Sequence, residues 1–244
     1  MDRLRLSIVV PVYNEEKTLP VIMERLQKAC GFAQVIYVDD GSRDRSLQIL
    51  RERALPRDTV LSKPNGGKGS AVRMGYGHAV GRYTIVQDAD LEYSPEEIPL
   101  MLSYAEARNL PAVFGSRRLK QQKQFVHLLF FIGGSLLTYA CNVLYRTRLT
   151  DQPTCYKMVQ TDLLKMIPLR ENDFRFDPEL TALLARFEVP IAEYPISYAP
   201  RTIEEGKKIS WKDWFRWMWV FLKIRISVLH PIPDDASVSV MERA

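Results

Sequence analysis

Two aspartates one residue apart, Asp88 and Asp90, follow an apolar run and are followed in turn by Glu92. In an extended chain every second side chain faces the same side, so the three carboxylates are expected on one side of the chain. Carboxylates gathered there repel one another unless a cation lies among them, and a ligand set of oxygen alone suits Mg²⁺ or Mn²⁺. The spacing predicts a divalent metal that holds a substrate's phosphates, with a solvated acidic turn as the alternative.

A glycine-rich segment, GGKGS at 66–70, offers a second place for phosphate. It resembles the end of a P-loop, but Ser62 and Gly69 stand where that motif requires Gly and Ser or Thr, so an ATPase is excluded. The glycines at 75, 77 and 81 precede a predicted strand instead of following one, which excludes a dinucleotide-binding turn. The backbone N–H groups of 66–69, beside Lys68, still predict a cradle for a diphosphate.

These groups need a scaffold, and the first half of the chain predicts one. Short β-branched apolar runs at 6–13, 34–38, 59–61 and 82–86 alternate with helical apolar spacing, the pattern of a mostly parallel sheet flanked by helices. Ligands bind where such strands end, so four polar clusters are expected on one rim. These clusters are residues 13–15, 39–42, 64–70 and 88–92.

Two further elements are predicted after this rim. Ser94, Pro95 and Glu97 have the spacing of a capping box at a helix start. Residues 112–114 predict a fifth strand, and Arg117 just after it suits a two-pronged clamp for a phosphate, with an ordinary surface charge as the alternative.

Eight motifs together resemble the family 2 inverting glycosyltransferases, and within them the polyprenyl-phosphate branch that includes the dolichol-phosphate mannosyltransferases. The resemblance covers residues 6–213 and implies the GT-A fold, a nucleotide-sugar donor and a polyprenyl phosphate acceptor. The motifs are VPVYNE at 10–15, VDDGS at 38–42, GKG at 67–69, DAD at 88–90, GSR at 115–117, LTDQPTCYK at 149–157, FRFDPE at 174–179 and Arg201 with EGKKISWKD at 205–213.

The resemblance also implies roles on the donor side. Asp88 and Asp90 are expected to bind the metal and the diphosphate, and Glu92 stands at the third metal position, which is often glutamine in the mannosyltransferases. Cys155 replaces a glycine of many relatives, so the sugar cannot be inferred. The expected contacts of the nucleotide are Pro11, Tyr13, Glu15, Asp40, Lys68 and Asp88.

On the acceptor side the attacking oxygen would belong to a phosphate monoester, which is largely ionised near neutral pH because its second pKa is about 6. A strong general base is therefore not required, and the main task is to place an anion. Asp151 and Asp177 are expected to orient groups around the acceptor or the sugar, with Asp151 and Asp90 the predicted catalytic carboxylates. The predicted acceptor-phosphate ligands are Arg117, Arg201 and Lys207 or Lys208.

Two apolar segments in the second half indicate a membrane surface. Residues 125–145 hold no charged side chain, but a spanning helix there would separate Arg117 from Asp151 across the bilayer. We therefore expect one or two interfacial helices at 120–146 and a second anchor at 211–229, where tryptophans alternate with Lys and Arg; a buried or dimer-forming helix is the alternative. Residues 231–244 predict a disordered tail.

The net charge of +5 is unevenly divided. Residues 1–116 hold 15 basic and 15 acidic side chains, whereas residues 117–230 hold 18 and 11. The basic excess is interleaved with apolar runs, which favours a membrane over nucleic acid as the anionic partner. Three widely spaced cysteines offer no disulfide framework and favour a reducing compartment.

These observations predict a GT-A-like α/β domain over 1–213 that transfers one sugar from a GDP- or UDP-sugar to a polyprenyl phosphate, with Mg²⁺ or Mn²⁺. It would act as a peripheral protein at the cytoplasmic face of a membrane, with a homo-oligomer possible. One alternative is a family 2 enzyme with a glycan, lipid or protein acceptor, which would need no polyprenyl phosphate. Another is an inactive membrane-associated scaffold, which would bind no nucleotide sugar.

Overall fold

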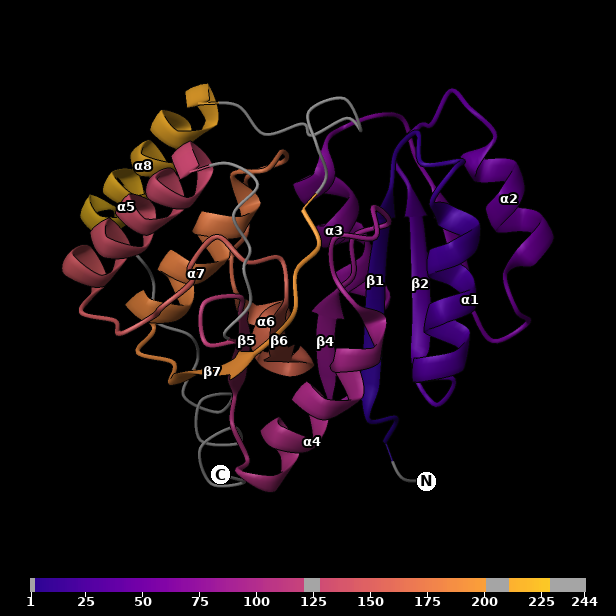
Figure 1. Ribbon diagram of the computed structural model, residues 1–244, viewed down its shortest axis with the longest axis horizontal. Coiled ribbons are helices and arrows are strands. Elements are labelled where there is room, and N and C mark those ends of the chain that lie inside the picture. Colours follow the sequence, from indigo (N-terminus) through magenta and orange to yellow (C-terminus); the bar gives the residue numbers. More distant parts are fainter. Residues whose placement is uncertain (1–2, 121–127, 201–210, 229–244) are drawn as a thin grey trace.

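A seven-stranded sheet forms the centre of the protein, seen in a computed structural model that describes residues 3–120, 128–200 and 211–228. The strand order is β3-β2-β1-β4-β6-β5-β7 (Figure 1). Five of the strands were predicted, and they are β1 (Leu6–Val12), β2 (Gln34–Asp39), β3 (Thr59–Ser62), β4 (Tyr83–Val86) and β5 (Ala112–Ser116). The other two, β6 (Lys157–Gln160) and β7 (Ile191–Pro195), were not predicted.

The sheet is mostly parallel, as the sequence predicts. Strand β1 pairs in parallel with β2 and β4, β2 with β3, and β5 with β7. Strand β6 alone runs antiparallel to its neighbours β4 and β5. The buried apolar runs predicted from the sequence explain this arrangement, since β1, β2, β4 and β5 are covered on both faces and bury nearly every residue.

Helices cover both faces of the sheet (Figure 1). One face carries α1 (Leu19–Cys30), which packs against α2 (Ser46–Arg53), the short 3₁₀ helix η1 (Pro95–Glu97) and α4 (Ile98–Ala107). The other face carries α3 (Lys68–His78), which packs against α6 (Thr161–Met166) and α7 (Phe176–Arg186). This alternation of strand and helix places every strand-to-helix connection of β1, β2 and β3 at one edge of the sheet.

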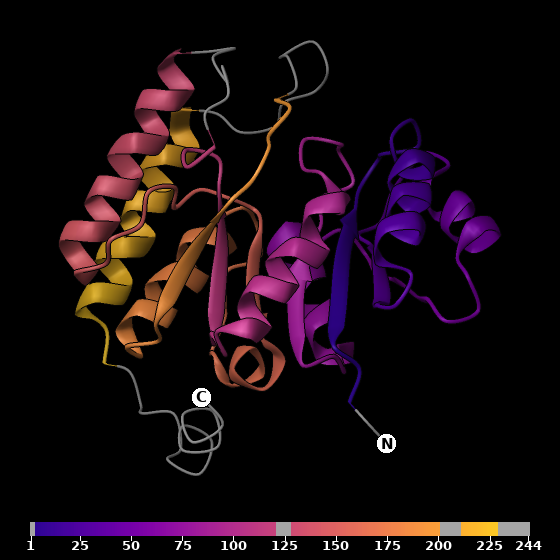
Figure 2. The ribbon, with the colours of Figure 1, turned by 60° about the horizontal axis from the view of Figure 1, so that its bottom comes forward.

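Two further helices, α5 (Leu128–Tyr145) and α8 (Trp211–Ile226), form an outer layer against α7 (Figures 1 and 2). They lie side by side and run in the same direction. In their first halves Trp214 Nε1 donates to the carbonyl of Gly133 (3.1 Å), and near their ends the Tyr145 hydroxyl donates to the carbonyl of Phe221 (2.6 Å). The described part of the interfacial insertion predicted at 120–146 contains one helix, α5. Among the described residues, no helix combines the length and the apolar character needed to cross a membrane.

The predicted capping box is wrong. Ser94 does precede a helical turn, but its side chain caps no backbone group of that turn. The Glu97 carboxylate instead accepts hydrogen bonds from Ser197 N (2.9 and 3.0 Å) and from Lys120 Nζ (2.8 Å). It therefore ties the start of α4 to the segment after β7, a long-range contact that competes with the local cap.

Candidate active site

The site lies where the order of the strands reverses. The chain proceeds from β1 outward to β2 and β3, then returns to β4 on the other side of β1. Pairing of β1 with β4 stops at Val9 and Val86, where β4 ends. Pro11 lies just beyond this point, inside β1 and not in the following loop, where its missing N–H breaks no ladder with β4. In α/β sheets a ligand usually binds at such a switch point, and the region at the carboxyl ends of β1 and β4 is therefore named the crevice.

The loops after β1 and β2 are fastened to each other. Asn14 N donates to Ser42 Oγ (3.1 Å), Glu15 N donates to Ser46 Oγ (2.9 Å), and Arg43 N donates to Asn14 Oδ1 (2.8 Å). The residues predicted to hold the nucleotide, Tyr13 and Glu15, therefore lie on one wall whose backbone is fixed by the neighbouring loop. Glu15 and Glu16 precede α1, which begins only at Leu19.

Asp40, predicted to contact the nucleotide, is buried and serves the glycine-rich loop. Its Oδ1 accepts hydrogen bonds from Lys63 Nζ (2.6 Å) and Gly66 N (2.9 Å), and its Oδ2 accepts one from Gly67 N (2.7 Å). The predicted diphosphate cradle is therefore wrong for these two N–H groups, since a protein carboxylate already occupies them. Asp40 holds the loop in shape immediately before Lys68.

Lys68 is aimed at the crevice by its two flanking glycines. Gly67 has a φ of 93°, and a β-carbon there would lie 2.7 Å from the carbonyl oxygen of Asn172. A β-carbon on Gly69 would lie 2.5 Å from the carbonyl oxygen of Glu171. The start of α3 can therefore approach the 171–176 segment only with glycine at both positions. Lys68 Nζ then lies 3.0 Å from Asp88 Oδ1 and 3.1 Å from Asp88 Oδ2.

The DAD segment after β4 is a turn, and the extended geometry predicted for it is wrong. Leu91 has a φ of 64°, and Asp90 Oδ1 accepts a hydrogen bond from Glu92 N (3.1 Å). The Glu92 carboxylate accepts one from the Tyr198 hydroxyl (2.9 Å), so it is drawn toward the segment after β7. Over 3–120, 128–200 and 211–228, no three His, Cys, Asp or Glu side chains lie close enough together to hold a metal.

Behind Lys68 lies a buried group of polar side chains. Lys68 Nζ is 3.7 Å from Asp177 Oδ2 and 3.6 Å from Cys155 Sγ, while Lys157 Nζ is 3.6 Å from Asp177 Oδ1. Burial acts to lower the pKa of Lys68, but Asp88 and the other acidic groups outweigh it and hold that pKa well above its usual range. For Lys157 burial prevails and lowers the pKa, whereas burial raises the pKa of the Cys155 thiol.

Arg117, the predicted phosphate clamp, is already bound to a carboxylate. Its Nε donates to Asp151 Oδ2 and its Nη2 to Asp151 Oδ1, both at 2.7 Å, and its guanidinium lies 4.8 Å from the centre of the Tyr198 ring. Asp151 is fully buried, so neither residue is free for the role predicted for it. Burial acts to raise the pKa of Asp151, but Arg117 outweighs it and lowers that pKa.

Residues 7–165 match the family model for glycosyl transferase family 2. The chain belongs to this family. The family resemblance predicted from the motifs is therefore confirmed over most of the region that carries them.

Among curated relatives of this family 2 glycosyltransferase are two undecaprenyl-phosphate 4-deoxy-4-formamido-L-arabinose transferases. That of Pectobacterium atrosepticum is 45% identical over 112 residues, which are 43% of this chain and 34% of the relative. That of Proteus mirabilis is 40% identical over 126 residues, 48% of this chain and 38% of the relative. The chain thus matches little more than a third of the length of these proteins.

The fold is shared with glucosyl-3-phosphoglycerate synthase from Mycobacterium tuberculosis. The complex of that enzyme with UDP gives a TM-score of 0.71 at 15% identity and covers 91% of this chain and 80% of the synthase. Its complex with Mn²⁺, UDP-glucose and phosphoglyceric acid gives a TM-score of 0.67 at 17% identity, over 91% and 79%. The predicted GT-A fold is confirmed.

Arg118 is a residue of this glycosyltransferase that motif reasoning missed. Its Nη1 donates to Ser135 Oγ (2.8 Å) and its Nη2 to the Phe131 carbonyl (3.3 Å), both on α5. The nearest approach to Asp151 is 3.9 Å, longer than a hydrogen bond. Burial, then the neighbouring Arg117 charge, lowers the pKa of Arg118 despite the attraction of Asp151. The only signal in the sequence was its place next to Arg117.

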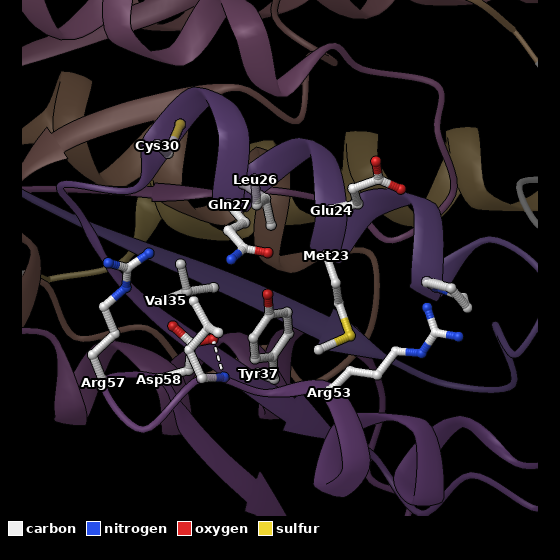
Figure 3. Close-up of a pocket in the computed structure, with 12 residues that line it drawn as sticks. Met23, Glu24, Leu26, Gln27, Cys30, Val35, Tyr37, Arg53, Arg57 and Asp58 are labelled. Atoms are coloured by element: carbon white, nitrogen blue, oxygen red, sulfur yellow. Dashed lines mark hydrogen bonds between the residues drawn. The ribbon is translucent and has the colours of Figure 1, made fainter.

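Other predicted ligands lie elsewhere. Arg201, Lys207 and Lys208 fall outside the described residues, as does the predicted tail at 231–244. A pocket with a volume of about 320 Å³ lies between α1, β2 and the loop after α2, with Tyr37, Met23 and Arg57 on its walls (Figure 3). None of the residues predicted from the sequence lines it, so the candidate site remains at the carboxyl ends of β1 and β4.

Proposed function

We propose that this glycosyltransferase transfers one sugar, with inversion, from a nucleotide sugar to a polyprenyl phosphate at a membrane surface. The observation that carries the proposal is the position of two cationic groups at the carboxyl edge of the sheet. Lys68 faces the crevice at the switch point, and Arg118 is held against α5, whose outer side is apolar. The matching segments of the undecaprenyl-phosphate sugar transferases support this reading.

A divalent cation fits the donor end of the crevice. Asp88 already attracts a positive charge, the Lys68 ammonium, and its side chain is 19% exposed. Asp88 and Asp90 would hold Mg²⁺ or Mn²⁺ with carboxylate oxygens, and substrate phosphates commonly complete the coordination of Mg²⁺ when a protein offers only one or two carboxylates. The ion would stabilise the negative charge that develops on the leaving diphosphate. Glu92 is left out of this set because its carboxylate is bound to Tyr198.

The chain's own task at the acceptor end is to hold an anion in place. Arg118 suits this task better than Arg117, since its guanidinium has no carboxylate within hydrogen-bond distance in the described structure and Ser135 supplies a hydroxyl beside it. Asp151, fully engaged by Arg117, orients that loop and takes up no proton. Arg201 and Lys208 remain proposed as further phosphate ligands.

The outer layer provides a surface for lipid. Exposed apolar side chains recur at intervals of four, three and four residues on α5 and again on α8, so each helix carries one stripe. The sequence from 214 to 226 contains Arg216, Lys223 and Arg225 but no Asp or Glu. An apolar face with cationic flanks fits an anionic bilayer, whereas two copies of it would repel each other. The two stripes are Ile132, Leu136, Tyr139 and Val143, and Phe215, Trp219, Leu222 and Ile226.

The test is a panel of UDP- and GDP-sugars incubated with the purified chain, Mg²⁺ or Mn²⁺, and vesicles that contain undecaprenyl or dolichyl phosphate. We expect one donor to yield a lipid-linked sugar and Asp90→Ala to abolish it without loss of the folded state. Transfer to a glycan, lipid or protein in the absence of any polyprenyl phosphate would favour the broader family 2 reading. Failure to bind any nucleotide sugar would indicate a scaffold.

A further inference from the structure

Four side chains of alternating charge lead from the core to the crevice. In order they are Lys157, Asp177, Lys68 and Asp88, and consecutive charged atoms are 3.6, 3.7 and 3.0 Å apart. Their side chains are 2%, 9%, 13% and 19% exposed, so exposure rises step by step toward the crevice. The four motifs that supply them come together only in the folded chain.

The middle pair of this series is incompletely satisfied. Asp177 Oδ1 is buried and has no hydrogen-bond donor among the described residues. Lys157 Nζ donates a hydrogen bond to the backbone carbonyl oxygen of Asp177 (2.8 Å) and not to its carboxylate. Lys68 lies at hydrogen-bond distance from Asp88 but at 3.7 Å from Asp177. The oxygen without a donor, Oδ1, lies on the Lys157 side, and Lys68 lies nearer to Oδ2. A buried carboxylate that is poorly hydrogen-bonded is unfavourable, so the Asp177 carboxylate gains if Lys68 moves to hydrogen-bond distance of Oδ2.

We infer that Asp177 is an alternative partner for the Lys68 ammonium. Lys68 moves from Asp88 to Asp177 when Asp88 binds the divalent cation of the donor complex. This inference rests on the proposed function for the presence of that cation. Two positive charges compete for one carboxylate at Asp88, and their repulsion grows as water is excluded. A displaced ammonium without a partner would be a buried unpaired charge, which is strongly unfavourable. Asp177, on the inner side of Lys68, prevents that outcome.

Lys157 acts in this scheme as a positioning residue. Its ammonium lies near Asp177 on the side away from Lys68, so it competes weakly for the same carboxylate. If Lys157 is replaced by an apolar residue, Lys68 becomes the only cation near Asp177 within the described structure. Lys68 should then move inward more readily and leave Asp88 freer for a metal.

The test measures binding of Mn²⁺ in the presence of UDP or GDP, from the electron paramagnetic resonance signal of free Mn²⁺, without any acceptor. We expect Asp177→Asn to raise the Mn²⁺ concentration for half-saturation at least tenfold, and Lys157→Met to lower it severalfold. In a Lys68→Met background each of these two substitutions should change the Mn²⁺ concentration for half-saturation less than twofold. The matched control is Asp173→Asn, which removes the same charge from a side chain that is 42% exposed and paired with Arg175; it should change the value less than twofold.

The double-variant cycle decides between a role through Lys68 and a direct electrostatic effect. If Asp177→Asn weakens Mn²⁺ binding equally with and without Lys68, Asp177 acts on the metal directly and the inference is overturned. Should Asp177→Asn fail to fold, the opposite sign expected for Lys157→Met is still a test, because loss of structure does not tighten metal binding. A wild-type chain that binds nucleotide without any dependence on Mn²⁺ overturns both this inference and the metal in the proposed function. A metal-dependent chain that makes no lipid-linked sugar contradicts only the proposed function.

Discussion

Asp151 receives three hydrogen bonds from Arg117 alone: one from its backbone N–H (2.9 Å) and one each from Nε and Nη2 (2.7 Å). The two residues are 34 positions apart, and Asp151 is fully buried. The pair joins the end of β5 to the loop before β6. Arg117 and Asp151 therefore have a structural role, because their hydrogen-bonding groups are used within the protein.

Removing the charge of Asp151 should therefore destabilise the fold. Asp151→Asn leaves the Arg117 guanidinium buried without a counter-ion, and breaking one side of a buried pair costs about 3–5 kcal/mol. We expect the free energy of unfolding, measured with urea at pH 7, to fall by about that amount. The double variant Arg117→Met/Asp151→Leu is the control, and it should recover most of the loss. A loss below about 1 kcal/mol for Asp151→Asn would show that the pair is worth no more than an exposed one.

The same pair predicts how stability depends on pH. Arg117 lowers the pKa of Asp151 below the ordinary carboxyl value of 3.8, so the unfolded chain takes up the proton first as the pH falls. The contribution of Asp151 is complete above the unfolded-state pKa and is lost as the pH falls through the folded-state pKa. The difference in unfolding free energy between wild type and Asp151→Asn should be constant from pH 7 to 5 and shrink below about pH 4. A difference that stays constant down to pH 3 would contradict this assignment.

The half of the fold that the sequence predicted is the half with local signals. Strands β2, β3 and β4 are apolar runs followed by polar residues, and this order alone places Asp40, Lys68 and Asp88 at one edge. Strands β6 and β7 have no such signal. β6 begins with Lys157, and the sequence gives no sign that this cation is buried beside Asp177.

The hydrogen-bond partners of side chains could not be predicted from the sequence, for a related reason. The motifs indicated that Asp40 and the 66–69 loop belong to one site, but not that Asp40 would occupy the N–H groups of Gly66 and Gly67. Arg117 suits a phosphate and a carboxylate equally well, and only the fold places Asp151 beside it. The sequence predicts which chemistry is present at an edge, while the hydrogen-bond partners depend on contacts between distant segments.

Replacement of Arg118 should affect the acceptor and not the donor. Arg118→Gln removes the charge held against Ser135, and a hydrogen bond to a charged group contributes about 1.5–3 kcal/mol, so the KM for polyprenyl phosphate should rise about tenfold or more. The KM for the nucleotide sugar should change less than about twofold. The guanidinium of Arg118 lies 4.6 Å from the centre of the Phe131 ring. Arg108→Gln is the matched control, since the Arg108 guanidinium, just after α4, lies 4.2 Å from the centre of the Tyr104 ring. Equal effects of Arg118→Gln on both KM values would place this residue outside the acceptor site.

The apolar stripe on α5 should determine whether the protein binds lipid. Leu136 on α5 and Leu100 on α4 are exposed to nearly the same extent, 51% and 54%, so Leu136→Glu and Leu100→Glu should affect the free energy of unfolding alike. Burying a leucine side chain contributes about 1.5–3 kcal/mol, and Leu136→Glu should therefore weaken cosedimentation with vesicles of anionic lipid at least tenfold. Leu100→Glu should leave this binding unchanged. Added salt should weaken the binding of both the wild type and Leu100→Glu, because Arg216 and Arg225 are exposed on α8. If both variants bind as wild type does, and wild type is a dimer in light scattering that Leu136→Glu converts to a monomer, the stripe is covered by a second copy of the chain instead of by lipid.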